Sequence, residues 1–297
     1  MDRFTLTGFA DEIAVDLEGQ IESFKSLGIG YMEIRMVDGV NITEHTLDEA
    51  RAIKRRLDAA GIGVSAIGSP IGKVSIEEPF DGYYPRFLHT LDMAETLGTR
   101  YIRLFSFYLP AGEDPEKYRD EVIARMSAFV AEARRRNIVL LHENEAGIYG
   151  ETAERCAALF AAIPSDHFKA VFDPANFVIA GDEVYPAAYE LLKEHIRYIH
   201  VKDAIVNEGG YELLPAGEGS SRFPELLRAL ASGGFAGFLS IEPHLHYIYG
   251  RMDVFAAYRQ AVLNNEPTEG FTRDGMSHFK RAYDALAGLL DTLPGRG

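Results

Sequence analysis

Four residues able to bind a metal ion stand at the ends of four short apolar runs in the second half of the sequence. They are Glu143, Asp173, His200 and Glu242, and each closes a run rich in β-branched, aliphatic or aromatic side chains. Three carboxylates and one imidazole form a ligand set that suits Mg²⁺ or Mn²⁺, with Co²⁺ or Zn²⁺ as further options. The sequence therefore predicts a divalent-cation site that leaves coordination positions for a substrate.

Taken one at a time, these four residues have ordinary structural explanations. A glutamate after an apolar strand often caps a helix or forms a surface ion pair, and a histidine in such a run is often a hydrogen-bonded core residue. These explanations do not account for the four residues as a group. Three acidic side chains in one cavity without a cation would be destabilised by desolvation and by like-charge repulsion. The joint pattern favours a metal site more strongly than any single residue does.

The elements that must position these residues alternate regularly along the chain. Apolar runs that predict strands occupy residues 4–10, 31–36, 63–68, 101–105, 138–143, 168–173, 198–203 and 238–242. Amphipathic patterns that predict helices lie near residues 15–27, 46–60, 83–97, 114–136, 151–162, 182–194, 222–231 and 273–290. Strands separated by helices pair in parallel through right-handed crossovers. We predict a single α/β domain over residues 1–297, a (β/α)8 TIM barrel in which the carboxyl ends of the strands converge on one face.

Residues at the predicted helix ends support this alternation. Residues that favour a left-handed backbone stand just past five helical patterns, as helix C-termini require: Gly28, Gly61, Gly98, Asn137 and Gly233. Thr46 and Glu49 form a capping box, and Asp114 with Pro115 marks another helix start. A doubly wound open sheet is the alternative architecture, but the first predicted turn lacks the glycine-rich fingerprint of that fold.

Composition excludes several classes of protein. The chain has 297 residues, of which 47% are hydrophobic and 25% charged, as in ordinary soluble globular proteins. Its formal net charge of −15 opposes nucleic-acid binding. The first residues lack the pattern of a signal peptide, no apolar run is long enough to cross a membrane, and Cys156 is the single cysteine. We therefore expect a cytoplasmic protein without disulfides, membrane contact or nucleic-acid partner.

Seven short motifs are spread over nearly the whole chain, at residues 28–35, 97–103, 142–144, 172–176, 200–203, 215–219 and 241–243. In order and spacing they resemble the xylose isomerase-like barrel family, also called the sugar phosphate isomerase/epimerase family. The resemblance implies a single metal ion held by Glu143, Asp173, His200 and Glu242, with the two glutamates as the acid/base pair. Several epimerases of the family have a histidine three residues after the aspartate. Here Asn176 takes that place, and its amide can bind a substrate oxygen but cannot supply a titratable proton.

Charged residues near the predicted ligands are candidates for substrate binding. Lys202 lies two residues after His200 and points to the same side of the strand, so it either binds a substrate oxygen or pairs with a neighbouring glutamate. Arg35 shares one strand face with Glu33, and both are expected to project inward at the mouth of the barrel. Arg103 on the fourth strand could join them, with an internal glutamate–arginine network as the structural alternative for Glu33 and Arg103.

The irregular stretch 243–272 follows the eighth predicted strand, on the active-site face of a barrel. We expect this extended loop to act as a lid over the mouth or as a dimer contact; a packed excursion with its own short helix is the alternative. His244, two residues beyond Glu242, is a candidate substrate contact at the rim. His142 has the parity opposite to that of Glu143, so it is expected to be structural.

Two further features have open alternatives. The turn 217–221 leads into a predicted helix, and its backbone amides could bind a phosphate, although Glu218 would repel one and a purely structural turn is the alternative. Cys156 lies inside a predicted helix and is expected to be a buried small apolar residue. Ser69 and Ser106 end strands without a Gly-x-Ser-x-Gly turn, so a hydrolase triad is not indicated.

The function predicted from these residues is that of a metal-dependent isomerase or epimerase. It would act on a small sugar or polyhydroxylated carbonyl compound through proton abstraction and an enediolate. The close alternative is a metal-dependent dehydratase, a lyase of a keto-cyclitol or keto-polyol. An endonuclease is less favoured because the third and fourth strands end without extra histidines, and a non-catalytic binding barrel is less favoured because all four ligands are present. The expected partners are a small polar substrate and, as an option, further copies of the chain.

Overall fold

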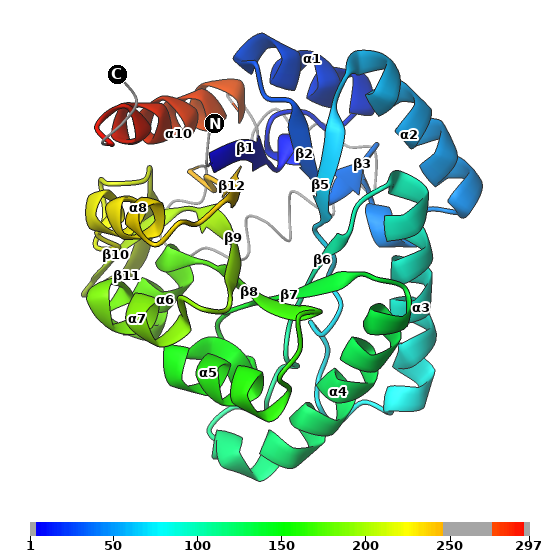
Figure 1. Cartoon of the computed structure of the whole chain (residues 1–297), viewed down its shortest axis with the longest axis vertical. Helices are drawn as coiled ribbons and strands as arrows, with labels where there is room; N and C mark the ends of the chain where they lie inside the picture. Colours follow the sequence, from blue (N-terminus) through cyan, green and yellow to red (C-terminus); the bar gives the residue numbers. More distant parts are fainter. Residues whose placement is uncertain (1–3, 246–274, 294–297) are drawn as a thin grey trace.

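Each of the eight apolar runs contributes one strand to a single parallel sheet. The strands are β1 (Phe4–Gly8), β2 (Tyr31–Ile34), β5 (Gly63–Ile67), β6 (Tyr101–Leu104), β7 (Val139–Glu143), β8 (Phe168–Phe172), β9 (Ile196–Val201) and β12 (Gly237–Ile241). In the computed structural model, which describes residues 4–245 and 275–293, they pair in the order β1-β12-β9-β8-β7-β6-β5-β2. The sheet curls into a nearly closed barrel (Figure 1), which confirms the predicted fold.

Amphipathic helices surround the barrel and cover its outer face (Figure 1). The longer ones are α1 (Leu17–Leu27), α2 (Leu47–Ala60), α3 (Phe80–Leu97), α4 (Arg119–Arg135), α5 (Ala153–Ala162), α8 (Phe223–Ser232) and α10 (Gly275–Asp291). Large apolar side chains on their inner sides, such as Phe24, Leu91 and Phe129, are fully buried in one continuous core. A chain of this length can bury enough apolar surface to fold without a disulfide. Among the described helices, none is long and apolar enough to cross a membrane.

The helix ends agree with the sequence at all but one of the predicted positions. Left-handed backbone occurs, as expected, at Gly28, Gly61, Gly98 and Asn137. Thr46 and Glu49 form the predicted capping box. The expectation for Gly233 is wrong: this residue is right-handed, with a φ of −73°. The left-handed residue is the next one, Gly234, because α8 extends one residue further than the apolar pattern indicates.

One helix of the observed fold had no counterpart in the sequence pattern. Helix α6 (Pro174–Ala180) begins immediately after β8. Its start is specified by Asp173, whose side chain accepts a hydrogen bond from the backbone N of Asn176, and by proline at the first helical position. The segment predicted as helix 182–194 contains only a π-helical turn at Val184–Ala188 and the short α7 (Tyr189–Leu192).

Two hairpins outside the barrel were not predicted either. Strands β10 (Asp203–Asn207) and β11 (Gly210–Leu214) pair in antiparallel fashion directly after β9, and β3 (Met36–Val37) pairs with β4 (Val40–Asn41) directly after β2. Both lie at carboxyl ends of barrel strands, so they enlarge the same face that carries the predicted ligands. The predicted loop over residues 243–272 lies, from residue 246 onward, outside the described residues.

The inside of the barrel is apolar in one part and polar in another. Ala66, Val139, Leu141, Val171 and Tyr198 form an apolar cluster there. A polar chain adjoins it. The Oγ1 of Thr7 lies 2.8 Å from the Oγ of Ser65, which lies 2.9 Å from the hydroxyl of Tyr198. Such groups are stable inside a protein only when they are hydrogen-bonded, so these side chains have fixed partners.

The barrel has one seam. Strands β1 and β2 are neighbours, but among the described residues no backbone ladder joins them, and they form the two ends of the sheet order. The seam runs between β1 and β2, and β12 pairs with the other edge of β1. Side chains from the loops that follow β1 and β2 meet there, as described below.

Candidate metal-binding active site

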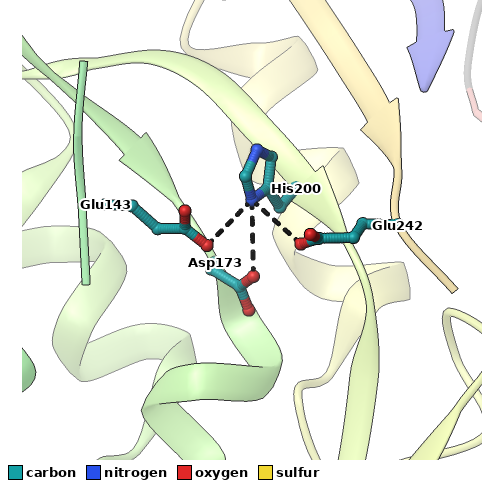
Figure 2. Close-up of side chains that lie close together, drawn as sticks. All are labelled: Glu143, Asp173, His200 and Glu242. Carbon is teal, nitrogen blue, oxygen red and sulfur yellow. Dashed lines mark hydrogen bonds and ion pairs between the residues drawn. The ribbon is translucent and has the colours of Figure 1, made fainter. Parts of the chain in front are cut away.

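The structure brings all four predicted ligands together at the carboxyl ends of four consecutive strands (Figure 2). Glu143 is the last residue of β7, and His200 is the second-last residue of β9. Asp173 directly follows β8, and Glu242 directly follows β12. One potential ligand atom from each residue lies within 4.8 Å of the others, and all four residues are buried. Positions 139, 141 and 143 alternate into the barrel, which is why Glu143 faces its interior.

His200 is at the centre of this group (Figure 2). Its Nδ1 atom lies 3.0 Å from Oε1 of Glu143, 3.5 Å from Oδ2 of Asp173 and 3.3 Å from Oε2 of Glu242. Burial lowers the pKa of His200, but the neighbouring glutamates, Glu143 first, outweigh burial and raise this pKa well above its ordinary value. The ring therefore carries positive charge among the carboxylates.

Two further cations contact the group. The Nζ of Lys202 lies 2.9 Å from Oδ2 of Asp173 and 3.2 Å from Oε2 of Glu242. The Nη1 of Arg103 lies 3.3 Å from Oε2 of Glu143. Lys202 thus forms the ion pair that was the structural alternative from the sequence, and it does so inside the ligand group. The internal glutamate–arginine network that was the structural alternative is present at Arg103, which pairs with Glu143 and Glu242, whereas Glu33 pairs with His200 instead.

These cations keep both glutamates ionised. Burial raises the pKa of Glu143, but His200 and Arg103 outweigh burial and lower this pKa to about 2. Burial likewise opposes ionisation of Glu242, but Lys202 and two histidines hold its pKa well below the ordinary value. Both side chains are therefore carboxylates at neutral pH, the protonation state that a proton acceptor needs.

Arg35 and His244 lie at the mouth beside Glu242. Arg35 Nη1 lies 3.0 Å from Oε1 of Glu242, while its Nε lies 2.8 Å from Oδ2 of Asp11. His244 Nε2 lies 3.3 Å from the same Glu242 oxygen, and its Nδ1 lies 2.7 Å from Oε1 of Glu12. Asp11 and Glu12 were missed in the sequence. They directly follow the first predicted strand, residues 4–10, so the strand-end rule that identified the four ligands could have found them.

Two asparagines order the ends of β7 and β8. Asn144 Nδ2 donates to the backbone O of Asp173 over 2.9 Å, and the backbone N of Asp173 donates to Oδ1 of Asn144 over 3.0 Å. Asn176 donates from Nδ2 to the backbone O of Asn144 over 2.8 Å and, over 3.4 Å, to Oε1 of Glu143. Asn176, predicted to bind substrate, therefore lies against a candidate base. Asn144 was missed, although it directly follows Glu143 in the sequence.

The residues present fit a divalent cation. Glu143 Oε2 and Asp173 Oδ2 are buried and face cationic groups, Arg103 Nη1 at 3.3 Å and Lys202 Nζ at 2.9 Å, so both oxygens lie where the protein concentrates positive charge. An oxygen-rich set with one imidazole is a suitable donor set for Mg²⁺ or Mn²⁺. A second group, Glu12, Glu242 and His244, shares one glutamate with the first. There the guanidinium of Arg35 already supplies a positive charge.

His142 is structural, as its parity predicts. It points away from the barrel interior, its Nε2 lies 2.9 Å from Oγ of Ser106, and it is buried against α5. Cys156 is buried beside it, as expected, and its Sγ donates to the backbone O of Gly150 over 3.1 Å. Neither side chain reaches the ligand group.

Burial lowers the pKa of His142 to about 4, so we expect its NMR titration midpoint near that pH. An unfolded histidine titrates near pH 6.5, so the neutral ring stabilises the fold fully above pH 6.5. This contribution is lost as the pH falls from 6.5 to about 4. It is on the order of 3 kcal/mol, at about 1.4 kcal/mol for each pKa unit between the folded and unfolded states. A midpoint near 6.5 for His142 in the folded protein would contradict this account.

The turn 217–221 surrounds a carboxylate of the chain itself. Asp203 accepts hydrogen bonds of 2.9–3.0 Å from the backbone N atoms of Ala204, Gly217, Gly219 and Ser221. The amides that could have bound a phosphate are therefore used, and the structural explanation of this turn holds.

Replacing Asp203 by alanine is expected to destabilise the fold by about 3–5 kcal/mol. The reason is that the backbone amides that donate to Asp203, some of which are buried, lose a charged acceptor. Each unsatisfied buried donor costs about 1–3 kcal/mol of stability. Chemical denaturation monitored by circular dichroism measures the change. Asp203→Asn, which keeps an acceptor oxygen, is the matched control and should lose less. A loss below about 1 kcal/mol for Asp203→Ala would show that the turn does not depend on this carboxylate.

The chain is thus a parallel α/β barrel protein with a buried carboxylate–imidazole group at the mouth of the barrel that could hold a metal ion. The model of the xylose isomerase-like TIM barrel family matches residues 21–282, and the chain belongs to this family. The resemblance inferred from the short motifs is thereby confirmed.

Three solved structures show how widely the fold is shared. The IolI protein with a bound zinc atom has 15% identity and a TM-score of 0.73, over 98% of this chain and 99% of that chain. An L-ribulose 3-epimerase has 20% identity and a TM-score of 0.71, over 98% and 95% of the two chains. The probable 3-DHS dehydratase AsbF from Bacillus anthracis has 15% identity and a TM-score of 0.67, over 89% and 99%. Comparison of the sequence with curated proteins finds no match.

Proposed function

We propose that this protein is a divalent-metal-dependent isomerase or epimerase of a small sugar or another polyhydroxylated carbonyl compound. The observation that carries the proposal is the pair of buried, ionised carboxylates, Glu143 and Glu242, which offer oxygens within 4.8 Å of each other beside Asp173 and His200. Membership of the xylose isomerase-like family supports the proposal, as does the similarity of the fold to that of an L-ribulose 3-epimerase.

Glu143, Asp173, His200 and Glu242 would hold the ion. Their three carboxylates favour Mg²⁺ or Mn²⁺, while Co²⁺ and Zn²⁺ also tolerate a mixed oxygen and nitrogen set. A structural neighbour described with a zinc atom is consistent with this. When bound, such an ion acts as a Lewis acid that makes a C–H bond next to a substrate carbonyl more acidic.

Proton transfer is assigned to Glu143 and Glu242. Because both are carboxylates at neutral pH, either can remove a proton from the substrate carbon that it faces. The same side chain is then the acid that returns the proton, and return to the adjacent carbon yields an isomer. Inversion at a single carbon needs a proton from the opposite face. There the second glutamate would return a proton that it has taken from solvent, and the first glutamate would release to solvent the proton that it removed.

The remaining polar side chains of the mouth are proposed to bind the substrate. Arg35, Arg103 and Lys202 carry N–H groups that can donate to hydroxyl or carbonyl oxygens, and each is held in place by a carboxylate partner. Asn176 and His244 offer further donors on either side of the two glutamates. Side chains already fixed by ion pairs need little reorganisation when a polar substrate arrives.

Dehydration is the alternative that the same residues allow. After a glutamate has removed a proton from the carbon next to the carbonyl, the neighbouring carbon can lose its hydroxyl group. The protonated carboxylate then acts as the acid, and the hydroxyl leaves as water. The similarity of the fold to that of a probable dehydratase supports dehydration as the second candidate reaction. The products separate the two reactions, because an isomer keeps the mass of the substrate whereas dehydration loses one water.

The test is a screen of ketoses, keto-cyclitols and keto-polyols with Mg²⁺ or Mn²⁺ in D₂O, followed by mass spectrometry and NMR. We expect deuterium at the carbon next to the carbonyl, in the product or in recovered substrate. Turnover of an identified substrate with neither solvent exchange nor a primary isotope effect at that carbon would rule out proton abstraction. A hydride shift or a hydrolytic reaction would then replace it.

A further inference from the structure

We propose that Glu33 is a positioning residue of the candidate metal centre. It holds the ring of His200 so that Nδ1 faces the three ligand carboxylates, and it thereby sets the affinity of the site for a divalent cation. The inference rests on the metal site proposed above and concerns a residue of β2, which contributes none of the four ligands.

The two ring nitrogens of His200 have separate partners. Nδ1 faces Glu143, Asp173 and Glu242 at 3.0–3.5 Å. Nε2 points the other way and lies 3.3 Å from Oε2 and 3.4 Å from Oε1 of Glu33. The ring is also packed edge-on against Phe9 and Tyr198, so it has little freedom to turn. Glu33 is thus the carboxylate on the side of the ring opposite to the ligand group.

A neutral histidine binds a metal through the nitrogen that carries no proton. If Nδ1 is the ligand atom, the ring proton must be on Nε2, and this tautomer is favoured when an acceptor waits at Nε2. A carboxylate in that position fixes the ring orientation and makes the ligand nitrogen more basic. Glu33 meets this requirement.

Glu33 is buried among His200, Ser240 and Tyr198. Its exposed fraction is 1%, and no lysine or arginine among the described residues pairs with it. A buried carboxylate without a cationic partner is costly by several kcal/mol. The Oγ of Ser240 donates to Oε2 of Glu33 over 2.6 Å, which orients the carboxylate toward His200. The positive partner of this buried carboxylate is therefore the ring of His200.

The experiment measures binding of Mn²⁺ to protein stripped of metal with a chelator, with free Mn²⁺ followed by electron paramagnetic resonance. The variants are Glu33→Ala, which removes the acceptor, and Glu33→Gln, which keeps an acceptor oxygen but no charge. The control is Thr7→Val, which removes the hydroxyl that contacts Ser65 at the far end of the buried polar chain from Glu33. Circular dichroism and thermal unfolding report on the fold of each variant.

We expect the affinity for Mn²⁺ to fall about 10–100-fold in Glu33→Ala, the range typical of lost partners of metal ligands. Glu33→Gln should fall less, by roughly tenfold. Thr7→Val should bind like the wild type. A second measurement uses protein labelled with ¹⁵N-histidine and loaded with Zn²⁺. Long-range NMR correlations should place the His200 proton on Nε2 in the wild type and show altered Nε2 shifts in the Glu33 variants.

The outcomes separate the inference from the proposed function. If the wild type binds one Mn²⁺ and both Glu33 variants bind it equally well, the inference is overturned and the metal site stands. If Thr7→Val loses as much affinity as Glu33→Ala, the effect is a general one of the polar interior and the inference is also overturned. If the wild type binds neither Mn²⁺ nor Zn²⁺, the proposed function fails and the inference fails with it. Should Glu33→Ala not fold, the affinity and ring tautomer of Glu33→Gln decide.

Discussion

Changing either Glu143 or Glu242 to glutamine should lower the turnover of the identified substrate by about 10²–10⁴-fold, the effect typical of a lost acid/base group. Glutamine has nearly the same shape, so substrate positioning is largely kept while the proton-accepting oxygen is lost. Both residues are also candidate ligands, so metal affinity should fall as well. Steady-state rates measured at saturating Mn²⁺ separate the two effects.

Glu145→Gln is the matched control for this prediction. Glu145 stands two residues after Glu143 and is partly exposed, and its Oε2 lies 2.7 Å from the Nζ of Lys73. It contacts none of the four ligand residues in the described ion pairs. We expect its loss to change turnover less than tenfold. Near-normal turnover in Glu143→Gln or Glu242→Gln at saturating metal would remove that glutamate from proton transfer.

The second large effect is expected from Asp173→Ala, which should abolish stoichiometric metal binding. Asp173 is fully buried, and its Oδ2 atom points at His200 and Lys202 in the middle of the ligand group. Its other oxygen caps α6, so the alanine variant also loses about 1 kcal/mol of helix stability. Metal content by plasma emission spectroscopy and Mn²⁺ titration give the readout.

Two further variants make the result specific. Asp173→Asn keeps a good helix cap but carries no charge, so it should fold like the wild type and still bind metal poorly. Asp166→Ala removes an exposed aspartate near the other end of β8, which pairs with Lys169, and should leave metal content unchanged. Unchanged metal content in Asp173→Ala would refute the assignment of this residue as a ligand.

Much of the fold and the ligand group follows from local rules. The alternation of apolar runs and helical patterns specifies a parallel barrel, and strand parity distinguishes Glu143, which faces the interior, from His142, which faces α5. Because parallel strands direct their carboxyl ends to one face, ligand residues 27 or more positions apart in the sequence could be predicted to meet. No long-range information was needed for that step.

Other parts of the site depend on tertiary contacts that no single strand encodes. Arg35 contacts Glu242 because β12 pairs with β1, which lies next to β2. The sequence alone does not give the distance between these two side chains. The orientation of His200, and hence its contact with Glu33, depends on packing against Phe9 and Tyr198. Arg103 could have paired with Glu33 or with Glu143, and only the shape of the interior decides between them.

At the seam between β1 and β2, the stability of the barrel and its specificity for a substrate depend on the same residue, Arg35. Arg35, just after β2, forms ion pairs with Asp11, after β1, and with Glu242, after β12. One guanidinium thus connects the segments that follow β2, β1 and β12, beside the two strands that share no backbone ladder in the described part of the chain. The same group borders the proposed reaction site. A mutation that adapts this position to a new substrate would therefore also loosen the closure of the barrel.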